Sequence, residues 1–187
     1  MIGAKGTAME YRESSPVSGA RASKDGRYRI VFSTALICVI LDQLTKLAVV
    51  TWIPFQHGIP VISGFFDLVH VRNRGAAFGI LNRSDIDWQF WLFVVATLVA
   101  AVLIFNLTRS SRFNRVLFLG SGLILGGAVG NLIDRVRLRA VIDFVDLHIA
   151  GWHWPAFNVA DIGICLGAAL CALCLWRSSG STGEGKS

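Results

Sequence analysis

Four long apolar runs constrain the fold of this chain more than any other feature. They cover residues 30–50, 88–107, 116–133 and 157–176. A helix needs roughly 20 apolar residues to cross about 30 Å of hydrocarbon. The chain is 53% hydrophobic and only 16% charged, too apolar for a soluble domain of 187 residues. We therefore predict an all-α polytopic membrane protein with four transmembrane helices.

The segments outside the four runs are more polar. Residues 1–29 and 177–187 are rich in Gly and Ser and lack hydrophobic periodicity, so we predict two disordered tails around a membrane domain at 30–176. Two longer loops, 51–87 and 134–156, flank the central runs. Within the first loop, residues 64–81 mix alternating Val, Phe and Leu with Gly, a pattern that predicts short strands and hence a small β-rich region.

Lys and Arg residues indicate how the chain is oriented in the membrane. They are concentrated in the two tails and in the connector 108–115, although both longer loops also carry arginine. Cytoplasmic segments carry an excess of Lys and Arg, so we predict both termini in the cytoplasm and loops 51–87 and 134–156 outside it. This arrangement accounts for the net charge of +6, and we expect no nucleic-acid partner.

Two aspartates lie in or beside apolar sequence, where a carboxylate is costly. They are Asp143, within Val-Ile-Asp-Phe, and Asp161, within Phe-Asn-Val-Ala-Asp. A carboxylate at the centre of a spanning helix costs roughly 2.5 to 3.5 kcal/mol on insertion scales, which favours a functional role. Two close carboxylates share one proton, so that one can activate water while the other polarises a carbonyl. The alternative for each is a buried acid that pairs with Arg or Asn.

Other polar residues in the apolar runs suggest support for such a site. Asp42 and Lys46 are four residues apart in the first run, the spacing of an ion pair on one helical face. Asp134 is a third candidate acid. Because Arg135 adjoins it and Asn131 lies one turn earlier, we predict a structural ion pair there rather than catalysis.

Spacing also gives roles to one asparagine and to a series of glycines. Asn158 precedes Asp161 by three residues, which predicts a shared helical face, with plain helix capping as the alternative. Glycines at 122, 126 and 130 repeat every fourth residue, the small-residue spacing that lets helices approach closely.

The cysteines and histidines predict neither a disulfide framework nor a metal site. All four cysteines fall in the predicted spans, so Cys171-x-x-Cys174 is interpreted as packing rather than as a redox or metal pair. The four histidines are scattered over the two longer loops without ligand spacing. We expect no metal and no cofactor.

Three other functions remain open at this point. A serine hydrolase with Lys46 as its base needs a nearby hydroxyl, yet Ser33 lies roughly 20 Å away along the same helix. A small transporter or channel subunit would also place Asp and Asn in apolar sequence. A noncatalytic assembly factor would use the first loop as a strand platform.

The polar residues fall into five ordered motifs that resemble those of the bacterial lipoprotein signal peptidases (signal peptidase II), a family of four-span aspartyl proteases. The resemblance covers roughly residues 35–176. The motifs are Asp42-Gln43-Leu44-Thr45-Lys46, Asn-Arg-Gly-Ala-Ala-Phe-Gly at 73–79, Gly-Gly-Ala-Val-Gly-Asn-Leu-Ile-Asp-Arg at 126–135, Val-Ile-Asp-Phe at 141–144 and Phe-Asn-Val-Ala-Asp at 157–161.

The resemblance implies an endopeptidase that removes the signal peptide from diacylglyceryl-modified prolipoproteins, cleaving before the lipidated cysteine. It implies a bacterial inner-membrane protein, with Asp143 and Asp161 catalytic near the extracytoplasmic face, that globomycin-type cyclic peptides inhibit. We expect a monomer. The residues that we expect to bind substrate or support the site are Asp42, Lys46, Asn73, Gly75, Asn131, Asp134, Arg135 and Asn158.

Overall fold

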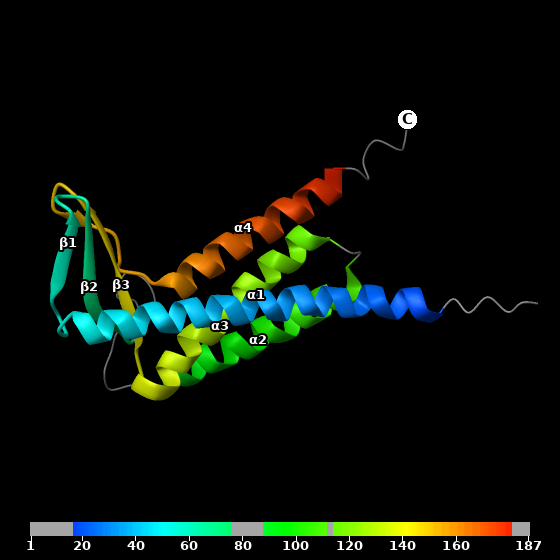
Figure 1. The fold of residues 1–187 in the computed structure, drawn as a ribbon, viewed down its shortest axis with the longest axis horizontal. Helices are drawn as coiled ribbons and strands as arrows, with labels where there is room; N and C mark the ends of the chain where they lie inside the picture. The colour runs from blue at the N-terminus through cyan, green and yellow to red at the C-terminus, as the bar shows by residue number, and fades with distance from the viewer. Residues whose placement is uncertain (1–16, 76–87, 112–113, 181–187) are drawn as a thin grey trace, which may run out of the picture.

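A computed structural model describes residues 17–75, 88–111 and 114–180, as four long helices and a small sheet at one end of them (Figure 1). Each helix contains a segment that is long and apolar enough to cross a bilayer. The fold class predicted from the apolar runs is therefore confirmed. The helices are α1 (Val17–Trp52), α2 (Trp88–Ser110), α3 (Arg115–Leu138) and α4 (Val159–Gly180).

Seven of the eight helix boundaries differ from the predicted ones, and α4 continues to Gly180, four residues into the predicted disordered tail. α1 begins at Val17, so residues 17–29 are helical rather than part of a disordered tail; residues 1–16 and 181–187 lie outside the described ranges. α3 continues to Leu138 and α4 begins at Val159, two residues after the predicted start. An apolar run marks where a helix lies in lipid, whereas helix formers such as Ala, Arg and Lys let it extend into water.

The extension of α3 changes where two predicted site residues lie. Asp134 and Arg135 belong to the last turns of the helix rather than to a loop. The helix ends because Arg139 adopts a left-handed conformation (φ 55°), and its N–H donates to the carbonyl oxygen of Arg135 at 3.0 Å. Both polar side chains are therefore carried by a rigid element.

The sheet joins the two longer loops. Its strands are antiparallel and lie in the order β1 (Gly58–Ile62), β2 (Phe66–Asn73), β3 (Val141–Ile149) and β4 (Trp152–His153). β2 confirms the strands predicted in residues 64–81, of which 76–81 lie outside the described part. β1 precedes that stretch, and the pattern did not predict β3.

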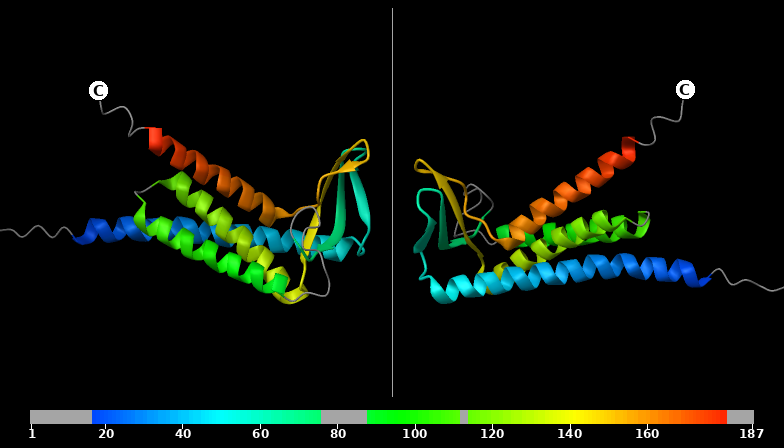
Figure 2. Two further views of the ribbon diagram at one scale, coloured as in Figure 1. Left: turned by 180° about the vertical axis from the view of Figure 1, so that it is seen from behind. Right: turned by 45° about the horizontal axis from the view of Figure 1, so that its top comes forward.

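Pairing of β2 with β3 places Val71 opposite Asp143 and Asn73 opposite Val141. The sheet stands at one end of the helices in every view (Figure 2). It therefore brings residues of the first loop close to a candidate catalytic aspartate.

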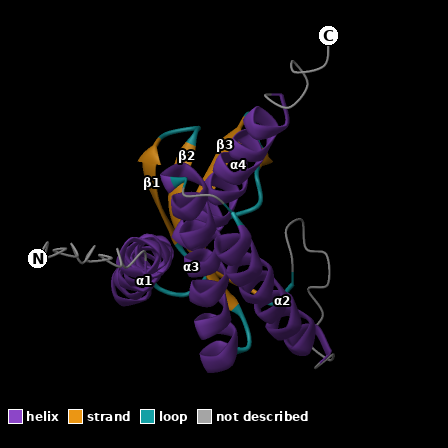
Figure 3. Ribbon diagram, turned by 90° about the vertical axis from the view of Figure 1, so that its right-hand side faces the viewer, coloured by secondary structure: helices purple, strands orange, loops and turns teal. Residues whose placement is uncertain are grey.

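α3 is the central helix of the bundle and contacts the other three (Figure 3). Glycines on two faces of α3 let α1 and α4 approach it closely. A Cβ atom at Gly122 or Gly126 would lie 2.6 Å from a backbone carbonyl oxygen of α1, and one at Gly120 would lie 2.8 Å from the carbonyl oxygen of Gly167 in α4. The close approach predicted from the glycine spacing is confirmed.

Replacing Gly126 by alanine should destabilise the protein. Alanine improves helix propensity by at most about 1 kcal/mol, but its methyl group would lie within 3 Å of Ala35 backbone atoms and of the Cys38 side chain. Overpacking against backbone costs about 1 to 3 kcal/mol. We expect Gly126→Ala to lower the melting temperature in detergent, whereas Ala169→Val, on an exposed position of α4, should leave it unchanged. Equal melting temperatures would contradict the close packing.

Candidate active site

A buried lysine lies at the centre of the polar residues that α1, α3 and α4 bring together. The Lys46 side chain is 2% exposed. Its Nζ donates to Asp42 Oδ2 at 2.9 Å and to Asn131 Oδ1 at 3.0 Å, and it lies 2.7 Å from Asp134 Oδ2. Three acceptors match the three protons of an ammonium group, so Lys46 is a poor candidate for the general base of a serine hydrolase.

These contacts confirm one predicted ion pair and correct another. Asp42 and Lys46 pair as their spacing predicted. The carboxylate of Asp134 pairs with Lys46 rather than with its sequence neighbour Arg135. Adjacent residues on a helix point in different directions, and the partner of Asp134 comes from another helix.

The two carboxylates bound to Lys46 also hold the backbone beside each candidate catalytic aspartate. Asp42 Oδ1 accepts a hydrogen bond from the N–H of Ala160 at 3.0 Å, directly before Asp161. Asp134 Oδ2 accepts one from the N–H of Ile142 at 3.2 Å, directly before Asp143. This ion group, formed by Lys46, Asp42 and Asp134, therefore positions β3 and the first turn of α4 together.

Asn158 connects the two candidate catalytic aspartates. It precedes α4 rather than lying on its face. Its Oδ1 accepts from the N–H of Asp161 at 3.0 Å, while Asp161 Oδ2 accepts from the N–H of Asn158 at 3.2 Å, a reciprocal capping arrangement. Its Nδ2 donates to Asp143 Oδ1 at 2.7 Å. The same side chain thus caps the helix and binds the other carboxylate.

Asp143 lies in an environment that favours its protonated form. The residue is 3% exposed. The pKa of Asp143 is raised to about 7. Burial and then the negative charge of Asp161 raise it, while hydrogen bonds from Asn158 and Asn73 and the charge of Lys46 oppose the shift. Asp161 in turn accepts from Asn131 Nδ2 at 2.8 Å. The two aspartates can therefore hold one proton near neutral pH.

A cavity of about 760 Å³ opens beside both aspartates. Arg135 lies on its polar side, where Nη2 donates to the carbonyl oxygen of Gly75 at 3.5 Å and the guanidinium carbon lies 3.7 Å from the centre of the Phe93 ring. The N–H of Gly75 donates to Asn73 Oδ1 at 3.0 Å. The apolar wall from α2 and α4 includes Phe93, Ala96, Ala100, Ile162, Ile164 and Leu166.

The structure thus gathers all ten predicted site residues around this cavity and the ion group behind it. It adds Gln43, whose Nε2 donates to Asp42 Oδ2 at 3.2 Å and to Asp134 Oδ1 at 3.1 Å. Its signals in the sequence were its place in the first motif and its position directly after Asp42. Asp146, by contrast, pairs with His153 Nδ1 at 2.9 Å and does not line the cavity.

Comparison with known proteins gives this arrangement a family. The family model described as Signal peptidase (SPase) II matches residues 34–177. The chain belongs to this family. Lipoprotein signal peptidases of Nitratidesulfovibrio vulgaris and Oleidesulfovibrio alaskensis are each 58% identical to it over 151 residues, which is 81% of this chain and 92% and 97% of theirs.

Solved structures agree with the sequence comparison. A bacterial membrane enzyme determined by the in meso method at 2.3 Å resolution aligns with a TM-score of 0.72 and 29% identity, covering 84% of this chain and 93% of that one. The resemblance stated from the five motifs is confirmed. The chain is an aspartic peptidase of the signal peptidase II family and a multi-pass protein of the bacterial inner membrane.

The raised pKa of Asp143 predicts how stability depends on pH. Its folded value of about 7 lies above the value of about 3.9 in an unfolded chain, so the folded state binds more protons between these pH values. The stabilisation is complete below about pH 4 and is lost as the pH rises to 7. Asp143→Asn mimics the neutral acid. We expect its melting temperature, relative to the wild type, to be higher at pH 8 than at pH 5; a constant difference would contradict the shift.

Proposed function

We propose that this chain removes the signal peptide from diacylglyceryl-modified prolipoproteins by cleaving before the lipidated cysteine, with Asp143 and Asp161 as its catalytic residues. The observation that carries the proposal is the pair of carboxylates joined through Asn158 at the edge of a large, partly apolar cavity. The names of the relatives, which are lipoprotein signal peptidases, support the substrate class.

In the proposed mechanism the pair begins with one proton. The ionised carboxylate takes a proton from water, and the resulting oxygen nucleophile attacks the carbonyl carbon of the scissile bond. The protonated carboxyl hydrogen-bonds to the carbonyl oxygen and gives its proton as the tetrahedral intermediate forms. Return of a proton to the leaving nitrogen breaks the C–N bond. The products are a signal peptide with a new carboxylate and a lipoprotein with a free amino group on its cysteine.

The two sides of the cavity suit the two parts of this substrate. The apolar side chains of α2 and α4 would contact the acyl chains and the apolar signal peptide. The Asn73 side chain, the Gly75 backbone and the Arg135 guanidinium lie beside Asp143 and would orient the peptide backbone. The Lys46 side chain lies behind the aspartate pair. Its charge would maintain the geometry of the pair, and it would not contact the substrate.

Two further properties are proposed on the same basis. Globomycin-type cyclic peptides would inhibit by filling the cavity beside Asp143 and Asp161. All proposed site residues come from one chain, so a monomer would suffice; light scattering of the purified protein tests this, and activity confined to a dimer would refute it.

Replacing either aspartate by asparagine should abolish cleavage. Asp143→Asn and Asp161→Asn keep the size of the side chain but remove the titratable proton, so each should lower kcat/KM about a thousandfold or more, with the double variant little worse. Asp146→Asn, on the same strand but outside the cavity, is the matched control and should retain near wild-type turnover. The measurement is cleavage of a purified diacylglyceryl prolipoprotein. Near wild-type activity of a correctly inserted Asp143→Asn or Asp161→Asn protein would refute the aspartyl mechanism.

The orientation in the membrane is a separate proposal, based on the distribution of basic residues. We expect both termini in the cytoplasm and the sheet and the aspartate pair near the extracytoplasmic face. In a background without native cysteines, a cysteine at Ser110 should be labelled by an impermeant reagent only after the membrane is opened, and one at His148 in intact cells. The reverse pattern would place the site on the wrong side for exported prolipoproteins.

A further inference from the structure

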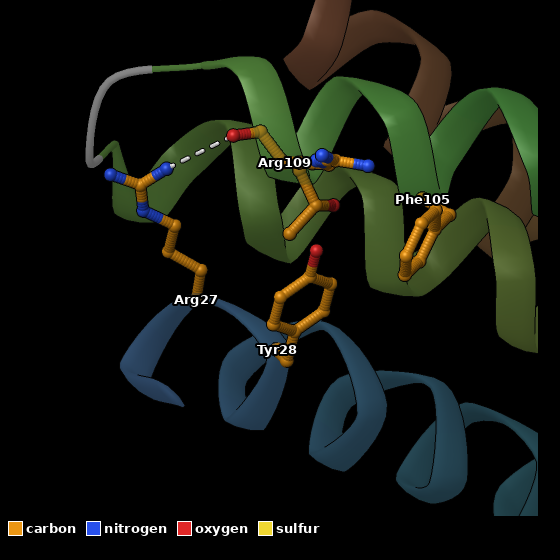
Figure 4. Close-up of a pocket in the computed structure, with 5 residues that line it drawn as sticks. Arg27, Tyr28, Phe105 and Arg109 are labelled. Carbon is orange, nitrogen blue, oxygen red and sulfur yellow. Dashed lines mark hydrogen bonds between the residues drawn. The ribbon is translucent and has the colours of Figure 1, made fainter. Parts of the chain in front are cut away.

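A second cavity lies between α1 and α2 (Figure 4). These parts of the two helices lie at the end of the bundle far from the sheet (Figure 1). It has a volume of about 320 Å³ and is lined by Arg27, Tyr28, Phe105, Thr108 and Arg109. Arg27 lies just before the apolar run 30–50, and Arg109 lies just after the apolar run 88–107. Both arginines therefore lie where hydrocarbon gives way to lipid headgroups.

Part of the Arg27 guanidinium has a structural role. Its Nη1 donates to the carbonyl oxygens of Ser111 at 2.8 Å and Arg109 at 3.5 Å, which satisfies carbonyl groups at the end of α2. Its Nε, however, is buried and has no hydrogen-bond partner. A ligand in the cavity would therefore meet the positive charge of Arg27 rather than this N–H.

The cavity carries an excess of positive charge. Among the side chains that the structure describes, neither Arg27 nor Arg109 has a carboxylate at ion-pair distance. The carboxyl end of α2 contributes about half a negative charge, which is smaller than the two positive charges of the guanidinium groups. The remaining positive charge favours an anionic ligand.

Two aromatic rings also line the cavity. The ring of Tyr28 stacks on that of Phe105 with centroids 5.7 Å apart, and the Tyr28 ring lies between the labelled Arg27 and Phe105 (Figure 4). Thr108 is buried and its hydroxyl donates to the Ile104 carbonyl oxygen at 2.7 Å. A cationic rim beside aromatic rings suits a ligand with an anionic head and an apolar body.

We propose that this cavity binds the phosphodiester headgroup of an anionic glycerophospholipid, with the Arg109 guanidinium donating to the phosphate oxygens and the charge of Arg27 adding to the attraction. The volume is near the lower end of the range for ligand cavities, about 300 to 1,000 Å³, so it takes a headgroup while the acyl chains remain in the bilayer. A soluble phosphate offers the same chemistry, but the position at the membrane boundary favours the lipid. The site is independent of the proposed catalytic function.

Lipid binding to the purified full-length protein tests the proposal. Phosphatidylglycerol and, as the zwitterionic control, phosphatidylcholine are titrated into detergent-solubilised protein, and bound lipid is measured by native mass spectrometry. Arg27→Gln and Arg109→Gln should each weaken phosphatidylglycerol binding about tenfold or more, because each removes one of the two positive charges that attract the phosphate. Arg29→Gln is the matched control: Arg29 is exposed and does not line the cavity, and its loss should change the affinity less than about twofold.

Three results would overturn the proposal. They are equal binding of the two lipids, unchanged phosphatidylglycerol affinity in Arg109→Gln, and displacement of phosphatidylglycerol by millimolar inorganic phosphate, which would assign the site to a soluble anion. Arg109→Gln decides the question even if Arg27→Gln fails to fold through loss of its contacts with α2, because the Arg109 side chain makes no hydrogen bond in the described part of the chain.

Discussion

The buried ammonium group of Lys46, held between two carboxylates, is the interaction on which the rest of the site depends. Removing a charge from water costs several kcal/mol, and a buried ion is tolerated only with well-placed partners. Lys46 has Asp42, Asp134 and Asn131 as partners. The other oxygen of each carboxylate accepts from Gln43 or from the N–H of Ala160. Loss of one partner from such a group costs about 3 to 5 kcal/mol.

This ion group could not form without glycines on α3. A Cβ atom at Gly130 would lie 2.6 Å from Asp42 Oδ2, so glycine leaves the space that the carboxylate occupies. A Cβ atom at Gly127 would likewise collide with the carbonyl oxygen of Ala160 in α4. Close packing of three helices thus sets the position of the residues that precede Asp143 and Asp161. The two aspartates belong to a strand and a helix, yet their backbones are tied to the same buried cation.

Much of the fold and of the site was predictable from the sequence where the pattern was local or periodic. Four apolar runs were enough to predict the spans, and the spacing of Asp42 and Lys46 predicted their pair. The Asp134–Lys46 pair was missed because its partners are far apart in sequence, and only the packing of α1 on α3 brings them together. β3 was missed because it becomes a strand by pairing with β2. Arg27 and Arg109 were interpreted only as signs of orientation, since their shared cavity depends on how α1 and α2 meet.

Amide hydrogen exchange at Ile142 and Ala160 tests most directly whether Lys46 positions the site. In the wild type both N–H groups donate to carboxylates that Lys46 holds together, and they should be strongly protected. Lys46→Met leaves Asp42 and Asp134 without their shared cation, so the account predicts that both amides lose protection together, while amides of α2, which the ion group does not contact, exchange as before. Wild-type protection of both amides in Lys46→Met would contradict it.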